Sequence, residues 1–458
     1  MAEIILPAKA LAVNPLKVSQ PVGASLAFLG LANTMPLEHG ARGCTSFNKL
    51  FFMRHFHEPI PLQTTAMDQM TTVLGADGNV VEALRTIADR NRPDIIGLIT
   101  TGLSEIQGAD IPSSIKAFRD TYPQYGEVAV VPVSATDTLG CLETGFGRAV
   151  EAIIAALVPA VPATVRHPRQ VNVLVPSMLT PGDIEVIREW VESFDLHPVV
   201  LPDVADSLDG HLIDAGYSTL TYGGTPRARI ATMGKSIATL VIGHSLARAA
   251  DLLKERTGVP DYRFPGLMGL EECDAFTQVL NDISGCPVPD RIARQRACLQ
   301  DAMVDTHFQL GGARIAVAAD AELLATLTRF LVGMGADVVA AVASASMPAL
   351  VALPVDSVIV GDLEDLEVRA RERGSELIIT NSHGAEVAAR LGVPLLRAGF
   401  PLYDHYGGFA RPWVGYGGSR QVLFDLANQL VTHHRGVKPY RSRYWQDTPR
   451  SREAPGCQ

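Results

Sequence analysis

The sequence predicts an α/β protein made of three doubly wound units, each with a parallel sheet flanked by helices. Short apolar runs alternate with amphipathic helical stretches, which is the pattern of buried parallel strands covered by helices. The chain has 458 residues, about three times the length of an ordinary domain. Hydrophobic residues make up 47% of it and charged residues 19%, so several apolar cores can form.

The N-terminal third, residues 1–160, is the least regular of the three expected domains. Apolar runs predict strands at 95–100 and 128–133. A helix is expected to begin at Asn79, because apolar residues recur on one face after it. A proline-rich stretch at 158–162 is interpreted as a linker to the next domain.

The second domain, residues 161–300, repeats the alternation of strand and helix. Thr180 and Asp183 resemble a capping box at a helix start. The stretch 261–310 is expected to be mainly helical and to connect to the third domain. Strands are predicted at 171–175, 199–201, 218–222 and 238–242.

The third domain, residues 301–458, shows the clearest pattern of strands and helices. Helical spacing is found at 321–333 and 364–373. The residues after Tyr440 are polar and are interpreted as an extended arm. Strands are predicted at 314–319, 338–343, 357–360, 377–380 and 394–397.

Charge and hydropathy exclude several classes of function. The net charge of −10 argues against nucleic acid or an anionic membrane surface as the main partner. No run of about 18 apolar residues occurs, so no membrane span is expected. The first residues lack the basic segment of a secretory signal, and the protein is expected in the cytoplasm.

The segment MPLEHGARGC, which ends at Cys44, is the main candidate for chemistry. It places His39, Arg42 and Cys44 within six residues, with glycines at Gly40 and Gly43. Glycines there permit close approach and unusual backbone angles. If Cys44 is a metal thiolate, Gly43 leaves room for a cluster and Arg42 offsets its charge. The alternative is a buried apolar cysteine in a tight loop.

The other cysteines are expected to be structural. Cys273, Cys286 and Cys298 lie 13 and 12 residues apart, which matches neither a zinc nor an iron–sulfur pattern. Cys141 follows a glycine at a helix start, and Cys457 lies in the polar tail. The glycine clusters of the chain complete no phosphate-binding motif, so nucleotide binding is poorly supported.

Several segments together resemble the nitrogenase component 1 family, and the resemblance covers most of the chain. Within the family, the match is to its cofactor-biosynthesis members. The segments that carry it are PLKVSQPVGASLAFLGL (15–31), MPLEHGARGC (35–44), RHFHEPIPLQTTAM (54–67), ITTGLSE (99–105), MGLEECDAF (268–276) and DTHFQLGGARIAV (305–317).

The resemblance implies three Rossmann-like domains and a role for one cysteine. In the catalytic β-subunit of the molybdenum-iron protein, the P-cluster cysteines correspond to Ser19, Cys44 and Gly102 here, and a cluster-contacting serine corresponds to Asp137. Only Cys44 is retained. A 4Fe-4S cluster needs four thiolates, so the resemblance implies that Cys44 and three cysteines of a NifE-like subunit share one.

The family also implies a scaffold and not an enzyme. The NifE-like partner would hold the iron-molybdenum cofactor precursor, within an α2β2 heterotetramer. The nitrogenase iron protein would deliver molybdenum and homocitrate, and apo-molybdenum-iron protein would accept the product. Gly40 and Gly43 would shape the Cys44 loop, while contacts of Arg42 and His39 with the cluster stay open.

Three alternatives stay open. The first is a catalytic β-subunit of the molybdenum-iron protein, against which the missing thiolates at Ser19 and Gly102 count. The second is a subunit like that of protochlorophyllide reductase. The third is a metal-free α/β binding protein or glycosyltransferase-like enzyme, in which Cys44 is only a core residue. No residue decides between a molybdenum and a vanadium system.

Overall fold

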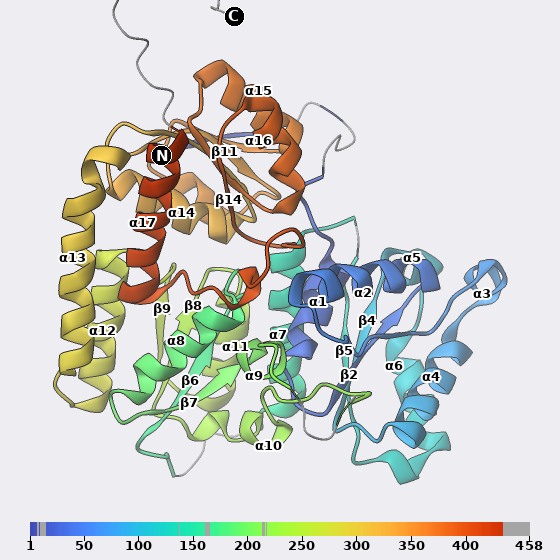
Figure 1. Ribbon diagram of the computed structural model, residues 1–458. Coiled ribbons are helices and arrows are strands. Elements are labelled where there is room, and N and C mark those ends of the chain that lie inside the picture. The colour runs from blue at the N-terminus through green and yellow to red at the C-terminus, as the bar shows by residue number, and fades with distance from the viewer. Residues whose placement is uncertain are drawn as a thin grey trace, which may run out of the picture.

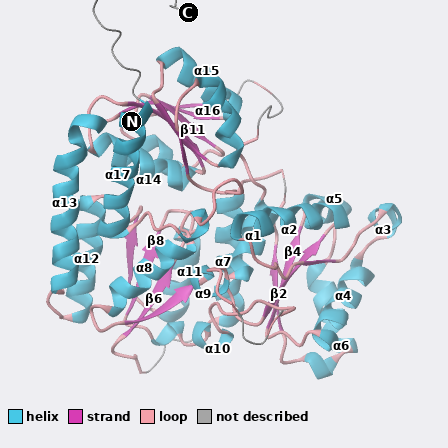
Figure 2. Ribbon diagram, viewed as in Figure 1, coloured by secondary structure: helices cyan, strands magenta, loops and turns pink. Residues whose placement is uncertain are grey.

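Three parallel β-sheets with helices packed around them form the protein, which confirms the predicted fold class (Figures 1 and 2). The computed structural model describes residues 1–6, 9, 15–136, 138–160, 165–212, 216 and 218–433. In Figure 1 the N-terminal unit lies on the right, the middle unit at the lower left and the C-terminal unit at the top.

The N-terminal sheet has the strand order β3-β2-β4-β5, and all its pairings are parallel. Its two inner strands end level, because His39 pairs with Thr100. The helices that follow these strands therefore begin at one edge of the sheet. The elements are α1 (Gln20–Leu29), β2 (Thr34–His39), α2 (Arg42–Phe56), β3 (Gln63–Thr64), α3 (Gln69–Leu74), α4 (Asp77–Arg90), β4 (Ile95–Thr100), α5 (Gly102–Gln107), α6 (Ile111–Thr121), η1 (Pro123–Tyr125), β5 (Ala129–Val133) and α7 (Leu142–Leu157).

The middle sheet has the order β7-β6-β8-β9, again parallel throughout. Two long helices, α12 and α13, follow it and form the helical connector predicted from the sequence. The short strand β9, at the start of that region, was not predicted. The elements are β6 (Gln170–Leu174), α8 (Pro181–Glu192), β7 (His197–Leu201), α9 (Val204–Ser207), α10 (Arg227–Ile230), η2 (Met233–Lys235), β8 (Ala238–Ile242), α11 (Ala247–Thr257), β9 (Asp261–Phe264), α12 (Leu270–Ser284) and α13 (Asp290–Leu310).

The C-terminal sheet has six strands in the order β1-β12-β11-β10-β13-β14. Its edge strand β1 comes from the start of the chain, and Glu3 pairs with Ser357. Helix α17 packs along α13 and joins this unit to the connector (Figure 1). The elements are β1 (Glu3–Ile5), β10 (Arg314–Ala319), α14 (Ala321–Gly333), β11 (Asp337–Ala343), η3 (Pro348–Ala352), β12 (Ser357–Val360), α15 (Leu363–Arg373), β13 (Leu377–Thr380), η4 (Ser382–Gly384), α16 (Ala385–Leu391), β14 (Leu395–Arg397), η5 (Gly408–Ala410) and α17 (Gly415–His433).

Two local predictions are wrong. Residues 218–222 form no strand but a loop that contacts the start of β2, where the Thr221 hydroxyl accepts from Thr34 N at 2.7 Å. Helix α4 begins at Asp77 and not at Asn79, whose side-chain amide donates to the carbonyl of Thr65 at 3.2 Å. The capping box of α8 is confirmed, since Thr180 Oγ1 accepts from Asp183 N at 3.0 Å.

Two further predicted segments are not described by the structure. The polar arm after Tyr440 lies outside the described residues, as do residues 161–164, which include part of the predicted linker.

Buried carboxylates join the three units where they meet. Glu143, in the first turn of α7, accepts a hydrogen bond from the backbone N–H of Glu322 at 2.8 Å. The Glu322 carboxylate accepts from the backbone N–H and the hydroxyl of Ser245, the latter at 2.9 Å, in the middle unit. Asp320, two residues earlier and directly before α14, accepts from Ser344 Oγ. Each unit thus supplies one part of a continuous chain of hydrogen bonds.

Burial changes the acidity of these carboxyls. It raises the pKa of Asp320 to about 6 and that of Glu322 to about 7. Burial, together with the charge of Glu322, also raises the pKa of Glu143 well above its ordinary value. The folded chain therefore binds protons that the unfolded chain releases, and the stability that this provides is lost as the pH rises through about 6 to 7.

We expect the Glu322→Gln variant to gain stability relative to wild type as the pH rises from about 5 to about 8, by roughly 1–3 kcal/mol. Glutamine keeps the shape of the protonated acid but cannot ionise in the buried site. Urea unfolding followed by circular dichroism at several pH values measures the difference. The exposed Glu192→Gln change is the control, and a pH-independent effect of Glu322→Gln would contradict the expectation.

Candidate functional site

Cys44 lies in the first turn of α2 and is exposed. Ala41 precedes the helix in extended conformation, so Cys44 is the third helical residue. Backbone N–H groups at a helix start lack partners within the helix and favour negative charge nearby. A metal-bound thiolate suits this position, and the alternative of a buried cysteine in a tight loop is wrong.

The loop between β2 and α2 is held by its neighbours. Gly40 lies so close to β4 that a Cβ there would be 2.8 Å from Thr101 Oγ1. The same hydroxyl donates to the carbonyl of His39 at 2.9 Å. A Cβ on Gly43 would meet nothing within 4 Å, so the space beside this residue is open as predicted. Neither glycine has a positive φ, and the expected unusual backbone angles are not found.

The structure separates the roles of His39 and Arg42. His39 is fully buried, and its Nδ1 bonds to Thr65 Oγ1 at 2.8 Å. Burial lowers the pKa of His39, so this ring stays neutral at ordinary pH. Arg42, in contrast, is exposed in the first turn of α2, two residues before Cys44.

The positions that the family resemblance pairs with cluster ligands lie at the starts of α1, α2 and α5, three neighbouring helices (Figure 1). Ser19 precedes α1 and Gly102 begins α5, and both are half-buried. Gln20, next to Ser19, accepts from the backbone N–H of Thr136 at 3.2 Å, so α1 begins beside the loop that follows β5. Asp137 lies outside the described residues. Cys44 is thus the one sulfur among the three described positions.

A buried carboxylate, which the sequence analysis did not single out, lies beneath the first turn of α2. Glu38 on β2 is fully buried and accepts hydrogen bonds from Ser25 of α1 and from Thr45 and Asn48 of α2. A glutamate two residues before the glycine loop was a visible signal, because a charged residue inside a buried strand needs specific partners.

Exposed apolar side chains occur on the helices and loops that follow the strands of this edge. Cys44, Phe47 and Leu50 follow at intervals of three residues, so they share one side of α2. Phe47 is 58% exposed and Leu50 48%. Ile106 of α5 and Leu139 of the loop before α7 are exposed as well. We call Phe47, Leu50, Ile106 and Leu139 the apolar edge.

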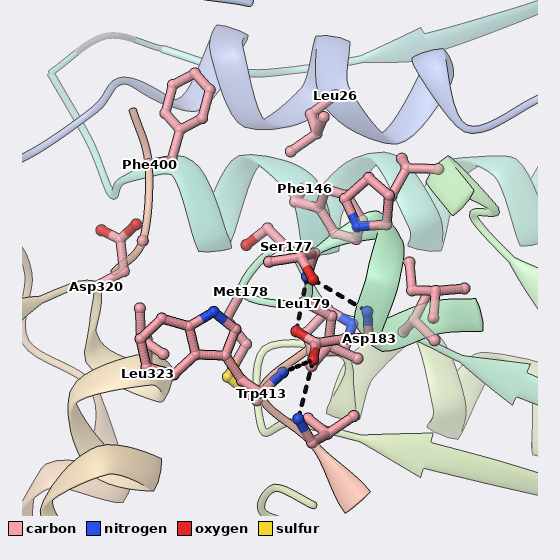
Figure 3. A pocket seen from close by; sticks show the side chains of 18 of the residues that line it. Leu26, Phe146, Ser177, Met178, Leu179, Asp183, Asp320, Leu323, Phe400 and Trp413 are labelled. Atoms are coloured by element: carbon pink, nitrogen blue, oxygen red, sulfur yellow. Dashed lines mark hydrogen bonds between the residues drawn. The ribbon is translucent and has the colours of Figure 1, made fainter. Parts of the chain in front are cut away.

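A separate small cavity of about 60 Å³ lies between the three units (Figure 3). Its walls are mainly apolar, with Leu26 and Phe146 from the N-terminal unit. Asp183 on its wall accepts from the backbone N–H groups of Thr180 and Val414, both at 3.0 Å, so its carboxylate already has structural partners. This space holds about four water molecules and is too small for a metal cluster.

The remaining described cysteines are not placed like Cys44. Cys141 and Cys273 are buried, and burial raises the pKa of the Cys141 thiol to about 12 and that of Cys273 well above its usual range. Cys286 and Cys298 are half-buried. Within the described ranges, no three His, Cys, Asp or Glu side chains are grouped to hold a metal ion. No described helix is long and apolar enough to cross a membrane.

The arrangement of the units is that of a nitrogenase component. A solved structure titled "Nitrogenase Cp1 at pH 6.5" superimposes with a TM-score of 0.88 and 29% identity, covering 93% of this chain and 95% of that one. Residues 19–431 match the family described as nitrogenase component 1 type oxidoreductase. The chain belongs to this family.

Within this family, the chain is similar over nearly its full length to several NifN proteins. The chain is 46% identical to the nitrogenase iron-molybdenum cofactor biosynthesis protein NifN of Klebsiella pneumoniae, over 96% of both chains. It is 44% identical to the NifN protein of Bradyrhizobium diazoefficiens, over 98% of this chain and 96% of that one. The NifN protein of a Nostoc strain is also 44% identical, over 94% and 96% of the two chains.

We expect iodoacetamide to alkylate Cys44 before Cys141 and Cys273 in the folded chain purified without iron. The reagent reacts with thiolates that it can reach, and the two buried thiols stay protonated. Peptide mass mapping over a time course measures the order. Equal rates at all three positions would show that the exposure of Cys44 is wrong.

Proposed function

We propose that this chain is a scaffold subunit for biosynthesis of the nitrogenase iron-molybdenum cofactor and not a catalytic subunit. Relatives of 44–46% identity over nearly the full chain carry the name of that process. The observation that carries the proposal in the structure is Cys44, an exposed cysteine at a helix start on the edge of the N-terminal sheet.

We propose that Cys44 is one ligand of a 4Fe-4S cluster shared with a second protein. Such a cluster needs four thiolates. Ser19 and Gly102, at the same edge, supply no sulfur. Cys141 and Cys273 are enclosed in cores. One ligand from this chain therefore requires three from a partner, which the resemblance identifies as a NifE-like subunit.

The apolar edge supports an interface at this place. Phe47 and Leu50 lie on the same side of α2 as Cys44 and leave apolar surface in water, which a protein partner would cover. Burial of this surface would also exclude water from the cluster. An α2β2 assembly with the NifE-like subunit is the arrangement that we propose.

The cofactor precursor belongs on the partner in this proposal. The cavity between the three units has a volume of only about 60 Å³, and Asp183 on its wall already accepts hydrogen bonds from backbone donors. The nitrogenase iron protein would bring molybdenum and homocitrate, and apo-molybdenum-iron protein would take up the finished cofactor. The described cysteines are free thiols, which is typical of a reducing compartment, and we propose that the protein lies in the cytoplasm.

A catalytic β-subunit is the second candidate, because a nitrogenase structure shares the fold with a TM-score of 0.88. The family resemblance pairs two of its three cluster cysteines with Ser19 and Gly102, which supply no sulfur. Substrate reduction by the reconstituted complex separates the two functions: nitrogen reduction at the rate of a true nitrogenase would contradict the scaffold role.

We expect the Cys44→Ala variant, purified anaerobically with its NifE-like partner, to lose the 4Fe-4S electron paramagnetic resonance signal and the corresponding iron. Three thiolates do not complete the cluster. Iron quantification and the resonance spectrum measure the loss. Cys298→Ala, a half-buried cysteine of α13, is the matched control. An unchanged signal and iron content in Cys44→Ala would reject Cys44 as a ligand.

We expect the double variant Phe47→Glu and Leu50→Glu to bind the NifE-like partner about tenfold or more weakly, because two charges would be buried at the interface. Affinity measured by surface plasmon resonance under anaerobic conditions checks this. Val368→Glu, at an exposed position of α15, is the control and should bind normally. Normal binding by the double variant would place the interface elsewhere.

A further inference from the structure

We propose that Glu38 is a positioning residue for the Cys44 ligand and that its negative charge lowers the reduction potential of the shared cluster. The inference rests on the proposed function of Cys44. It concerns a residue of β2 that lies under the cysteine-bearing helix and is itself no ligand. Its basis is the set of hydrogen bonds that converge on this one side chain.

Three donors from two helices meet at the Glu38 carboxylate. Its Oε1 accepts from Ser25 Oγ at 3.1 Å and from Asn48 Nδ2 at 2.9 Å. Its Oε2 accepts from Thr45 Oγ1 at 2.7 Å. All four residues are buried. Amide and hydroxyl groups that donate to a carboxylate favour its ionised form.

These contacts bind the first turn of α2 to the strand beneath it. Thr45 follows Cys44 directly in the chain, and Asn48 lies one turn further along the same helix. Rotation or sliding of this turn would break two bonds to a buried carboxylate, which is costly. Ser25 connects the same carboxylate to α1, the helix that begins after Ser19. Glu38 therefore fixes the direction in which Cys44 projects from the edge.

The position of Glu38 argues against a purely structural role. An apolar residue would fill a buried strand position without the cost of desolvating a charge. The glutamate there accepts hydrogen bonds from side chains of α1 and α2, and two of the donors, Thr45 and Asn48, lie one and four residues after the proposed ligand. Groups that orient a metal ligand in this way commonly change metal affinity about 10–100-fold when they are altered.

The charge has its own effect. A buried negative charge near a cluster disfavours the addition of an electron, because interactions between charges are strong where water is excluded. Glu38→Gln keeps the shape of the side chain and removes the charge. Thr45→Val keeps the charge and removes one positioning bond at nearly equal volume. The two variants therefore separate charge from position.

The experiment uses the full chain in complex with its NifE-like partner, purified anaerobically. We expect Glu38→Gln to bind the partner normally but to shift the midpoint potential of the cluster to a more positive value in a redox titration followed by electron paramagnetic resonance. We expect Thr45→Val to lower iron retention during chelator challenge, with a smaller shift in potential. Both variants should also speed alkylation of Cys44 several-fold in the iron-free chain.

The outcomes distinguish the two proposals. If Cys44→Ala loses the cluster while Glu38→Gln and Thr45→Val match wild type in potential, iron retention and alkylation rate, only the role of Glu38 is overturned. If Cys44→Ala keeps the cluster, both proposals are overturned. If Glu38→Gln does not fold, Thr45→Val decides: unchanged iron retention and alkylation rate would overturn the positioning role.

Discussion

The parallel pairing of β2 with β4 determines where the candidate ligand lies. Because His39 is level with Thr100, the two strands end together and their following helices, α2 and α5, begin at one edge. Gly40 permits the close contact with Thr101 that keeps the intervening loop against β4. A shift of one residue in this register would place Cys44 on another level relative to α1 and α5. The proposed site depends on this pairing more than on any single side chain.

The sequence predicted much of the fold, because most strands are continuous apolar runs. The ranges 95–100, 238–242, 314–319, 357–360 and 377–380 agree with the structure residue for residue. Strand β2 was missed for a physical reason. Its sequence TMPLEH contains Pro36, which is unusual inside a sheet, and the buried polar residues Glu38 and His39. These residues serve the neighbouring loop and helices, and such long-range partners leave no periodic pattern.

The candidate site was predicted in part. The glycines around Cys44 indicated an open loop, and the structure places the cysteine at an exposed helix start. The support from Glu38 was not predicted, since its partners Ser25 and Asn48 lie 13 and 10 residues away in two different helices. Ser19 and Gly102 were singled out by the family resemblance alone, since no local pattern points to a ligand at either position.

The edge strand β1 joins the start of the chain to the C-terminal sheet. Residues 3–5 complete the C-terminal sheet by pairing with 357–359. During synthesis, this first strand must wait until more than 350 further residues have left the ribosome before its partner exists. A C-terminal fragment that begins after the middle unit would lack β1. Its strand β12 would then be the edge strand, with unpaired backbone groups that favour aggregation. The C-terminal sheet can therefore be completed only when the first residues and the C-terminal unit are both present.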